Sequence, residues 1–201
     1  MKQNKRIIGV TGGVGCGKST IMNLLQERFG ARILLADQLG HCAMKKGEES
    51  YDKICRLFGN RAVLQNGELD RSYLAQIIYK DAGKRNELNQ IIHPYVKQKM
   101  REYLKEWENE PLVAIETAIM YETGCDELCD TVWYVYTDPE NRIRRLRESR
   151  GYSREKAEEI MAVQISDEEG RRMADAWIDN NGPIEKITDR LQELLGISAK
   201  M

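Results

Sequence analysis

This chain has few cysteines, no long apolar run and no excess of either charge, and each of these features excludes a class of protein. The 201 residues include only four prolines, two phenylalanines and five cysteines. The cysteines are odd in number and scattered, which favours free thiols in a reducing cytoplasm over a disulfide framework. No apolar run approaches the roughly 20 residues that cross a bilayer. Neither charge is in excess, because 31 Lys and Arg face 32 Asp and Glu. We therefore expect no membrane partner and no general affinity for nucleic acid.

What is present indicates a globular α/β fold. Hydrophobic residues make up 41% of the chain and charged residues 31%, and the length fits one domain with insertions. Short apolar runs predict strands at residues 6–10, 33–35, 112–115, 132–137 and 176–178. Helical spacing predicts helices at residues 19–29, 142–172 and 184–195, and several more between residues 38 and 107. Strands that alternate with helices predict a mostly parallel sheet. We expect the first two strands to be neighbours, and Pro94 to begin a helix.

Residues 12–19, Gly-Gly-Val-Gly-Cys-Gly-Lys-Ser, match the pattern G-x-x-x-x-G-K-[ST] at every fixed position. A strand pattern precedes this P-loop and a helix pattern follows it, as nucleotide binding requires. The glycines allow the backbone to turn successive N–H groups toward phosphate oxygens, and the helix N-terminus adds positive potential. The predicted nucleotide ligands are therefore Gly13, Gly15, Cys16, Gly17, Lys18, Ser19 and Thr20.

Within this loop the side chains predict separate roles. Lys18 can reach the β- and γ-phosphates, which makes it a candidate catalytic residue, and the Ser19 hydroxyl can bind Mg²⁺. Thr20 is either a ligand of the α-phosphate or a plain helical residue. Glu116, after the third predicted strand, could orient Mg²⁺ through water or serve as a loop residue. The expected cofactors are ATP and Mg²⁺.

The remaining sequence favours a small-molecule kinase over other P-loop proteins. No Asn-Lys-x-Asp stretch is present to read guanine. Asp37 follows the second predicted strand, where a carboxylate can take a proton from an attacking hydroxyl; the alternative is a cap for a helix that begins at Gln38. The arginine-rich segment from Arg142 onward can stabilise the transferring phosphate, with Arg145 and Arg147 as the catalytic candidates. Charge runs are usually solvated, but the density of arginines here favours a role for one or two of them. Arg144 and Arg150 stay open as alternatives.

Motifs along nearly the whole chain resemble one family. They are the P-loop, Ala36-Asp37, Leu69-Asp70-Arg71, His93-Pro94, Gln164, Ala174-Asp175 and the residues 180–182. Together they are similar to the dephospho-CoA kinases. The resemblance implies ATP-dependent phosphorylation of the ribose 3′-hydroxyl of dephospho-CoA, the last step of coenzyme A biosynthesis. It also implies a nucleoside-monophosphate-kinase-like core as a single domain over residues 1–201, with a helical CoA-binding insertion at 38–110 and a lid at 139–172.

The resemblance also assigns residues to the site. It implies that Asp37 is the base, that Arg71 and His93 line the acceptor side, and that Asn180 lies near the adenine. The residues alone favour a solvated Arg71, and His93 could equally be structural. Gln164 and Asp175 could tie the lid to the core. The expected partners are the substrates ATP and dephospho-CoA, in a monomer or weak homo-oligomer. Two alternatives stay open: a P-loop kinase for a nucleoside, nucleotide or sugar-like acceptor, and a nucleotide-dependent switch without catalysis.

Overall fold

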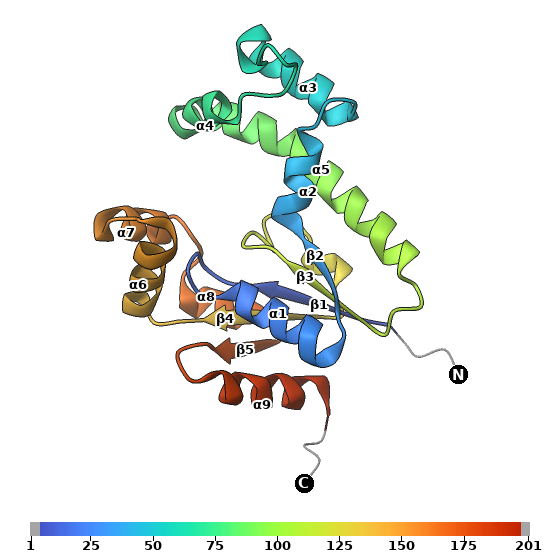
Figure 1. The fold of residues 1–201 in the computed structure, drawn as a ribbon, viewed down its shortest axis with the longest axis vertical. Coiled ribbons are helices and arrows are strands. Elements are labelled where there is room, and N and C mark those ends of the chain that lie inside the picture. Colours follow the sequence, from blue (N-terminus) through green and yellow to red (C-terminus); the bar gives the residue numbers. More distant parts are fainter. Residues whose placement is uncertain (1–4, 198–201) are drawn as a thin grey trace. The chain divides into compact units, whose positions relative to one another are not determined.

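The computed structural model describes residues 5–197 and divides the chain into two compact units (Figure 1). One unit, here the sheet unit, comprises the described residues 5–34 and 108–197. The other, here the helical unit, is Leu35–Trp107. Within the described residues no helix is long and apolar enough to cross a membrane.

Five strands form one sheet in the order β2-β3-β1-β4-β5. The parallel pairs that join β1 to β3, β1 to β4 and β4 to β5 confirm the α/β prediction. Buried hydrophobic residues fill β1, β3 and β4, as expected of a parallel sheet covered on both faces. The strands are β1 (Arg6–Thr11), β2 (Arg32–Leu35), β3 (Leu112–Glu116), β4 (Thr131–Tyr136) and β5 (Ala176–Asp179).

The expectation that the first two strands are neighbours is wrong, because β3 lies between β1 and β2. The helix α1 (Lys18–Phe29) connects β1 to β2 and contacts both β1 and β3. An α-helix is about 10 Å wide, roughly twice the spacing between strands. The chain that leaves this helix therefore returns to the sheet one position further out, and β3 fills the place between.

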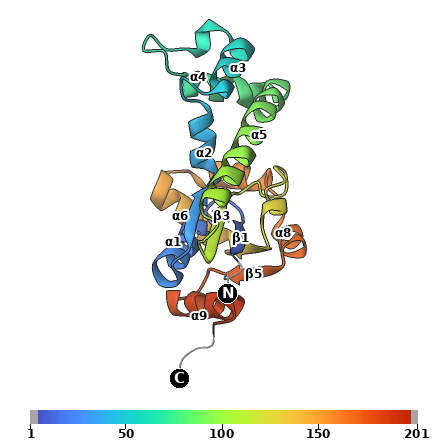
Figure 2. The same ribbon diagram turned by 90° about the vertical axis from the view of Figure 1, so that its right-hand side faces the viewer.

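The helices of the sheet unit lie on both sides of the sheet, with α1 and α8 on opposite sides (Figure 2). The helix α9 packs on β5 and α1, and α8 packs on β4. The segment predicted as helical from 142 to 172 is three helices, which are broken at Gly151 and before Ser166. The bounds are α6 (Pro139–Arg150), α7 (Arg154–Ala162), α8 (Asp167–Met173) and α9 (Ile184–Leu195), with a 3-10 turn at Asp126–Leu128.

The helical unit has a small core of its own. Tyr51, Ile54, Leu69, Leu74 and Leu88 are buried together there. Its helices begin with local caps: the carboxylates of Asp70 and Asp81 accept hydrogen bonds of 2.9 Å from backbone N–H groups three residues on. The elements are α2 (Ala36–Ala43), α3 (Glu49–Phe58), a 3-10 turn at Asn60–Ala62, α4 (Arg71–Lys80) and α5 (Ala82–Glu106).

The expectation that Pro94 begins a helix is wrong, because Pro94 lies inside the 25-residue helix α5. An internal proline removes one helical hydrogen bond and costs about 3 kcal/mol. Here both halves of the helix are held by packing, since Leu88 belongs to the core of the helical unit and Val96, Met100 and Leu104 are buried further along. The proline itself is exposed.

Candidate functional site: a phosphate-binding loop and an adjoining arginine cluster

The P-loop has the backbone that its glycines permit. Gly12, Gly15 and Gly17 have φ values of 142°, 77° and 87°, which side-chain-bearing residues rarely adopt. Gly17 caps α1, which begins at Lys18. Within the described residues, the backbone N–H groups of Gly15, Gly17, Lys18 and Ser19 donate no hydrogen bond. A loop with several unpaired N–H groups at a helix N-terminus is an anion-binding arrangement.

The lysine of the motif lies against its own loop. Lys18 Nζ donates to the carbonyl oxygens of Gly12 at 2.9 Å and Gly13 at 3.3 Å. Ser19 and Thr20 occupy the first turn of α1, and the Ser19 side chain is exposed. The Lys18 ammonium group and the Ser19 hydroxyl therefore both lie near the N-terminus of α1, as the motif predicts.

One carbonyl oxygen of the loop accepts hydrogen bonds from three side chains. The Cys16 carbonyl oxygen accepts hydrogen bonds from Asn180 Nδ2 at 2.7 Å, Thr137 Oγ1 at 2.8 Å and Arg145 at 3.3 Å. Thr137 directly follows β4, Asn180 directly follows β5, and Arg145 belongs to α6. Residues from three separate parts of the chain therefore hold this peptide group. The Cys16 thiol is buried, and burial raises its pKa above the ordinary value for cysteine. Cys16 therefore takes part in the loop through its backbone.

A second cluster holds the tip of the loop at Val14. The Val14 N–H donates to Gln164 Oε1 at 2.9 Å, and the Val14 carbonyl accepts from Arg142 Nε at 2.9 Å. Arg142 also donates to Gln164 Oε1 at 3.0 Å and is only 5% exposed. The prediction that Gln164 ties the 139–172 segment to the core is confirmed. Asp175 instead ties the start of β5 to β4, through hydrogen bonds with the backbone of Val132.

The arginines of α6 lie in two different environments. Arg142 and Arg145 face the P-loop, and Arg145 also donates to the Asn180 carbonyl at 2.8 Å. Arg144 and Arg147 are exposed on the other side of the helix. Sequence reasoning missed Arg142, although its position three residues before Arg145 places the two on one helical face.

The acidic candidate of the sheet unit lies at the end of β3. Glu116 pairs in register with Val10, two residues before the P-loop begins. No cluster of three or more His, Cys, Asp or Glu residues with metal-binding geometry occurs in the part of the chain that the structure describes. The Ser19 hydroxyl and the Glu116 carboxylate are oxygen donors of the kind that suits a hard cation such as Mg²⁺.

The acceptor-side candidates all lie in the helical unit. Asp37 is exposed in the first turn of α2, whose N-cap is Leu35, so the alternative reading of Asp37 as a helix cap is wrong. Arg71 is the first residue of α4 and is exposed, while its neighbour Asp70 caps the helix. His93 is half-buried in α5.

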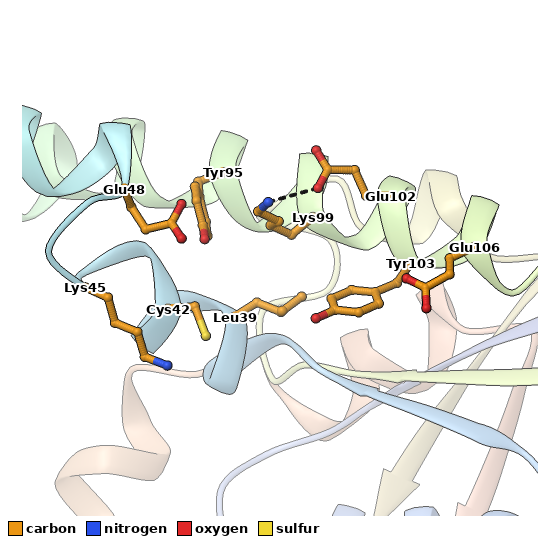
Figure 3. Close-up of a pocket in the computed structure, with 9 residues that line it drawn as sticks. All are labelled: Leu39, Cys42, Lys45, Glu48, Tyr95, Lys99, Glu102, Tyr103 and Glu106. Carbon is orange, nitrogen blue, oxygen red and sulfur yellow. Dashed lines mark hydrogen bonds and ion pairs between the residues drawn. The ribbon is translucent and has the colours of Figure 1, made fainter.

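A pocket of about 340 Å³ lies between α2 and α5 of the helical unit (Figure 3). Lys99 donates to Glu102 at 2.9 Å on its wall. Burial and a hydrogen bond with Glu48 raise the pKa of Tyr95 to about 12, so this phenol stays neutral at physiological pH. The lining is Leu39, Cys42, Lys45, Glu48, Tyr95, Lys99, Glu102, Tyr103 and Glu106.

Comparisons with known proteins identify the family of this chain. The family model described as dephospho-CoA kinase matches residues 6–186. A dephospho-CoA kinase of Symbiobacterium thermophilum is 37% identical over 189 residues, which are 93% of this chain and 79% of that protein. The Geobacter sulfurreducens enzyme of the same name is 36% identical over 94% of this chain and 96% of its own. A Thermus thermophilus protein, TT1252, has a crystal structure that matches with a TM-score of 0.84 and 31% identity, over 98% of this chain and 100% of that one. The chain therefore belongs to the dephospho-CoA kinase family, whose members phosphorylate dephospho-CoA with ATP in the final step of coenzyme A biosynthesis.

Proposed function

We propose that this chain transfers the γ-phosphate of ATP to the ribose 3′-hydroxyl of dephospho-CoA, with the P-loop as the phosphate site. The observation that carries the proposal is the set of unpaired N–H groups at Gly15, Gly17, Lys18 and Ser19, in a chain of this family. Charge on the transferring phosphoryl group is spread over its equatorial oxygens, so fixed donors and cations around it supply most of the catalysis.

Each nucleotide-side residue has a role in the proposal. The backbone of Gly13 to Gly17, including Cys16, surrounds the phosphates, and Lys18 leaves its loop carbonyls to bind the β- and γ-phosphates. Thr20, in the first turn of α1, is placed for the α-phosphate. Asn180 belongs to the loop after β5, which we assign to the adenine side, and its own side chain braces the P-loop at Cys16.

The donor set beside the P-loop fits Mg²⁺. Ser19 would bind the ion through its hydroxyl and Glu116 through water. When bound, Mg²⁺ supplies positive charge that neutralises the phosphate oxygens.

Two arginines of α6 complete the nucleotide side. Arg145 places its charge beside the loop while its hydrogen bonds go to protein oxygens. Its contribution is therefore electrostatic and positional. Arg147 is exposed on the side of α6 that faces away from the P-loop, and its guanidinium has no hydrogen bond or ion pair within residues 5–197. Its catalytic role stays a prediction that Arg147→Ala tests directly.

The acceptor side of the proposal rests on the helical unit as the CoA-binding insertion, with residues 139–172 as the lid. Asp37, two residues after β2, accepts the proton of the attacking hydroxyl, because ligands of parallel α/β sheets bind at the carboxyl ends of strands. Arg71 pairs with the acceptor pyrophosphate and His93 contacts the acceptor. The pocket between α2 and α5 offers Tyr95, Tyr103 and the cation of Lys45 to the remainder of a long acceptor.

A cytoplasmic location and a monomeric or weakly associated state complete the proposal. All five cysteines are free thiols, which is the state that a reducing compartment maintains. Size-exclusion chromatography with light scattering measures the oligomeric state.

The test is the release of ADP by the full chain with dephospho-CoA, AMP or adenosine as the acceptor. Dephospho-CoA is expected to have by far the highest kcat/KM, because binding of its remote parts positions the hydroxyl. Equal use of AMP would refute the CoA assignment and favour a general nucleotide kinase. ATP binding without transfer to any acceptor would favour a switch.

A pair of variants tests the acceptor side. Arg71→Ala is expected to lower kcat/KM for dephospho-CoA while ATP affinity stays unchanged. Arg85→Ala is the matched control, because Arg85 is also an exposed arginine near the start of a helix of the same unit. If both variants behave alike, Arg71 is a solvated surface residue.

A further inference from the structure

We infer that Arg142 and Gln164 are positioning residues that set the direction of the peptide groups in the P-loop, an inference that rests on the proposed nucleotide-binding role of that loop. Together they take up both backbone hydrogen-bonding groups of Val14. Gln164 Oε1 accepts from the Val14 N–H and from Arg142, and Arg142 Nε donates to the Val14 carbonyl. Three residues thus form a closed ring of hydrogen bonds across 128 and 150 positions of sequence.

This ring determines the orientation of the two peptide groups on either side of Val14. In a trans peptide the C=O of one residue and the N–H of the next point in opposite directions, and no cis peptide occurs in the described residues. The hydrogen bond to the Val14 N–H therefore turns the Gly13 carbonyl away from Gln164. That carbonyl in fact accepts from Lys18 Nζ and from the Cys16 N–H, both at 3.3 Å.

The same argument applies to the next peptide group along. Arg142 holds the Val14 carbonyl, so the N–H of Gly15 points away from Arg142. This N–H is one of the unpaired donors of the loop. The Cys16 carbonyl is held likewise by Asn180, Thr137 and Arg145, which turns the unpaired Gly17 N–H the other way. Side chains outside the loop thus hold the alternate carbonyls and leave the alternate N–H groups for phosphate.

Burial and close packing restrict the movement of this ring of hydrogen bonds. Arg142 is 5% exposed and its remaining nitrogen lies 3.7 Å from Asp167, whose carboxylate also accepts from Tyr134 at 2.6 Å. Gly13 lies directly against the guanidinium, since a Cβ there would be 2.1 Å from an Arg142 nitrogen. The Val14 side chain packs with Leu146 and others in the small core between α6 and α7. Buried charged hydrogen bonds of this kind are costly to break.

The experiment measures the affinity of the full chain for a non-hydrolysable ATP analogue, together with the thermal unfolding midpoint. Gln164→Met keeps the size of the side chain but removes the shared acceptor, which leaves the Val14 N–H without its partner. We expect affinity to fall on the order of tenfold, as for loss of one buried hydrogen bond. Gln164→Glu keeps an acceptor oxygen for both donors beside the Arg142 guanidinium, and it is expected to restore most of the affinity.

A control separates positioning from general support. Met161 packs in the same core between α6 and α7 and touches neither hydrogen-bonding group of Val14. Met161→Ala is expected to lower the unfolding midpoint and to leave analogue affinity unchanged. The inference is overturned if folded Gln164→Met binds the analogue as the wild type does, if Gln164→Glu loses as much affinity as Gln164→Met, or if Met161→Ala loses it equally. Failure of the wild type to bind the analogue at all would instead overturn the proposed function.

Discussion

The side-chain amide of Asn180 lies in hydrogen-bond contact with the carbonyl oxygen of Cys16, at 2.7 Å across 164 positions of sequence. Gly17 follows directly, and a Cβ at Gly17 would lie 2.1 Å from the same amide nitrogen. Gly17, the last glycine of the motif, is therefore required for two reasons. Its φ is positive, and the loop after β5 approaches too closely to leave room for a side chain. The loop after β5 and the phosphate loop are therefore joined directly by this hydrogen bond.

Replacement of Lys18 tests the phosphate loop. Lys18→Ala removes a cation whose hydrogen bonds within the described residues go only to loop carbonyls, so the fold is expected to survive. Loss of such a charge from the transition state costs roughly 3 kcal/mol or more, and turnover should fall at least a hundredfold. Steady-state ADP release measures this, with Lys53→Ala, an exposed lysine of α3, as the control. Near-normal turnover of Lys18→Ala would contradict the assignment.

Replacement of Asp37 tests the general base. Asp37→Asn keeps the size of the side chain and removes its basicity, so kcat is expected to fall on the order of 10² to 10⁴. ATP affinity should be unchanged. Asp37 also lies in the first turn of α2, where loss of its charge costs about 0.3–1 kcal/mol of stability. Single-turnover kinetics per folded molecule separate the two effects, with Asp52→Asn as the exposed control. Retained turnover with lower stability would show a purely structural role.

Replacement of Gly170 tests the packing of α8 on the sheet. A Cβ at Gly170 would lie 2.2 to 2.7 Å from three ring carbons of Tyr134. That ring is buried and its hydroxyl is held by Asp167, so it has little room to move. Gly170→Ala is expected to lower the free energy of unfolding by roughly 1–3 kcal/mol. In the control Gly40→Ala the new Cβ would lie 3.7 Å from Ile92, an ordinary contact. Urea denaturation compares the two, and equal stabilities would contradict this packing.

The reactivity of the cysteines tests the environment of Cys16. Its thiol is 1% exposed, and burial raises its pKa, so it stays protonated and inaccessible at pH 8. Cys129 is similar, because burial and nearby acidic groups raise its pKa to about 12. Cys42 is half-buried and lines the pocket of the helical unit. Because the thiolate is the nucleophile, iodoacetamide is expected to label Cys42 well before Cys16 and Cys129. Mass spectrometry of timed digests measures the order, and early labelling of Cys16 would show that the P-loop opens.

Local patterns in the sequence were sufficient to predict the five strands and the phosphate loop. The five apolar runs and the motif at residues 12–19 describe backbone conformation within a few positions, and each is found in the structure. Turn and strand propensities act over that short range. The same locality explains the error at Pro94, where a strong local signal was outweighed by packing on both halves of α5.

The tertiary structure decided whatever depends on contacts between distant segments. The place of β3 between β1 and β2 follows from the width of the crossing helix and from a strand that arrives 77 positions after Leu35, since β3 begins only at Leu112. The motif names Val14 and Cys16 as variable positions, yet their carbonyls are held by Arg142, Asn180 and other side chains more than 120 positions away. A hydrogen bond depends on the three-dimensional approach of two groups, and no spacing along the chain encodes that approach. The loop that matches the phosphate-binding motif could thus be located from the sequence, while the side chains that hold its carbonyl groups emerged only once the chain was folded.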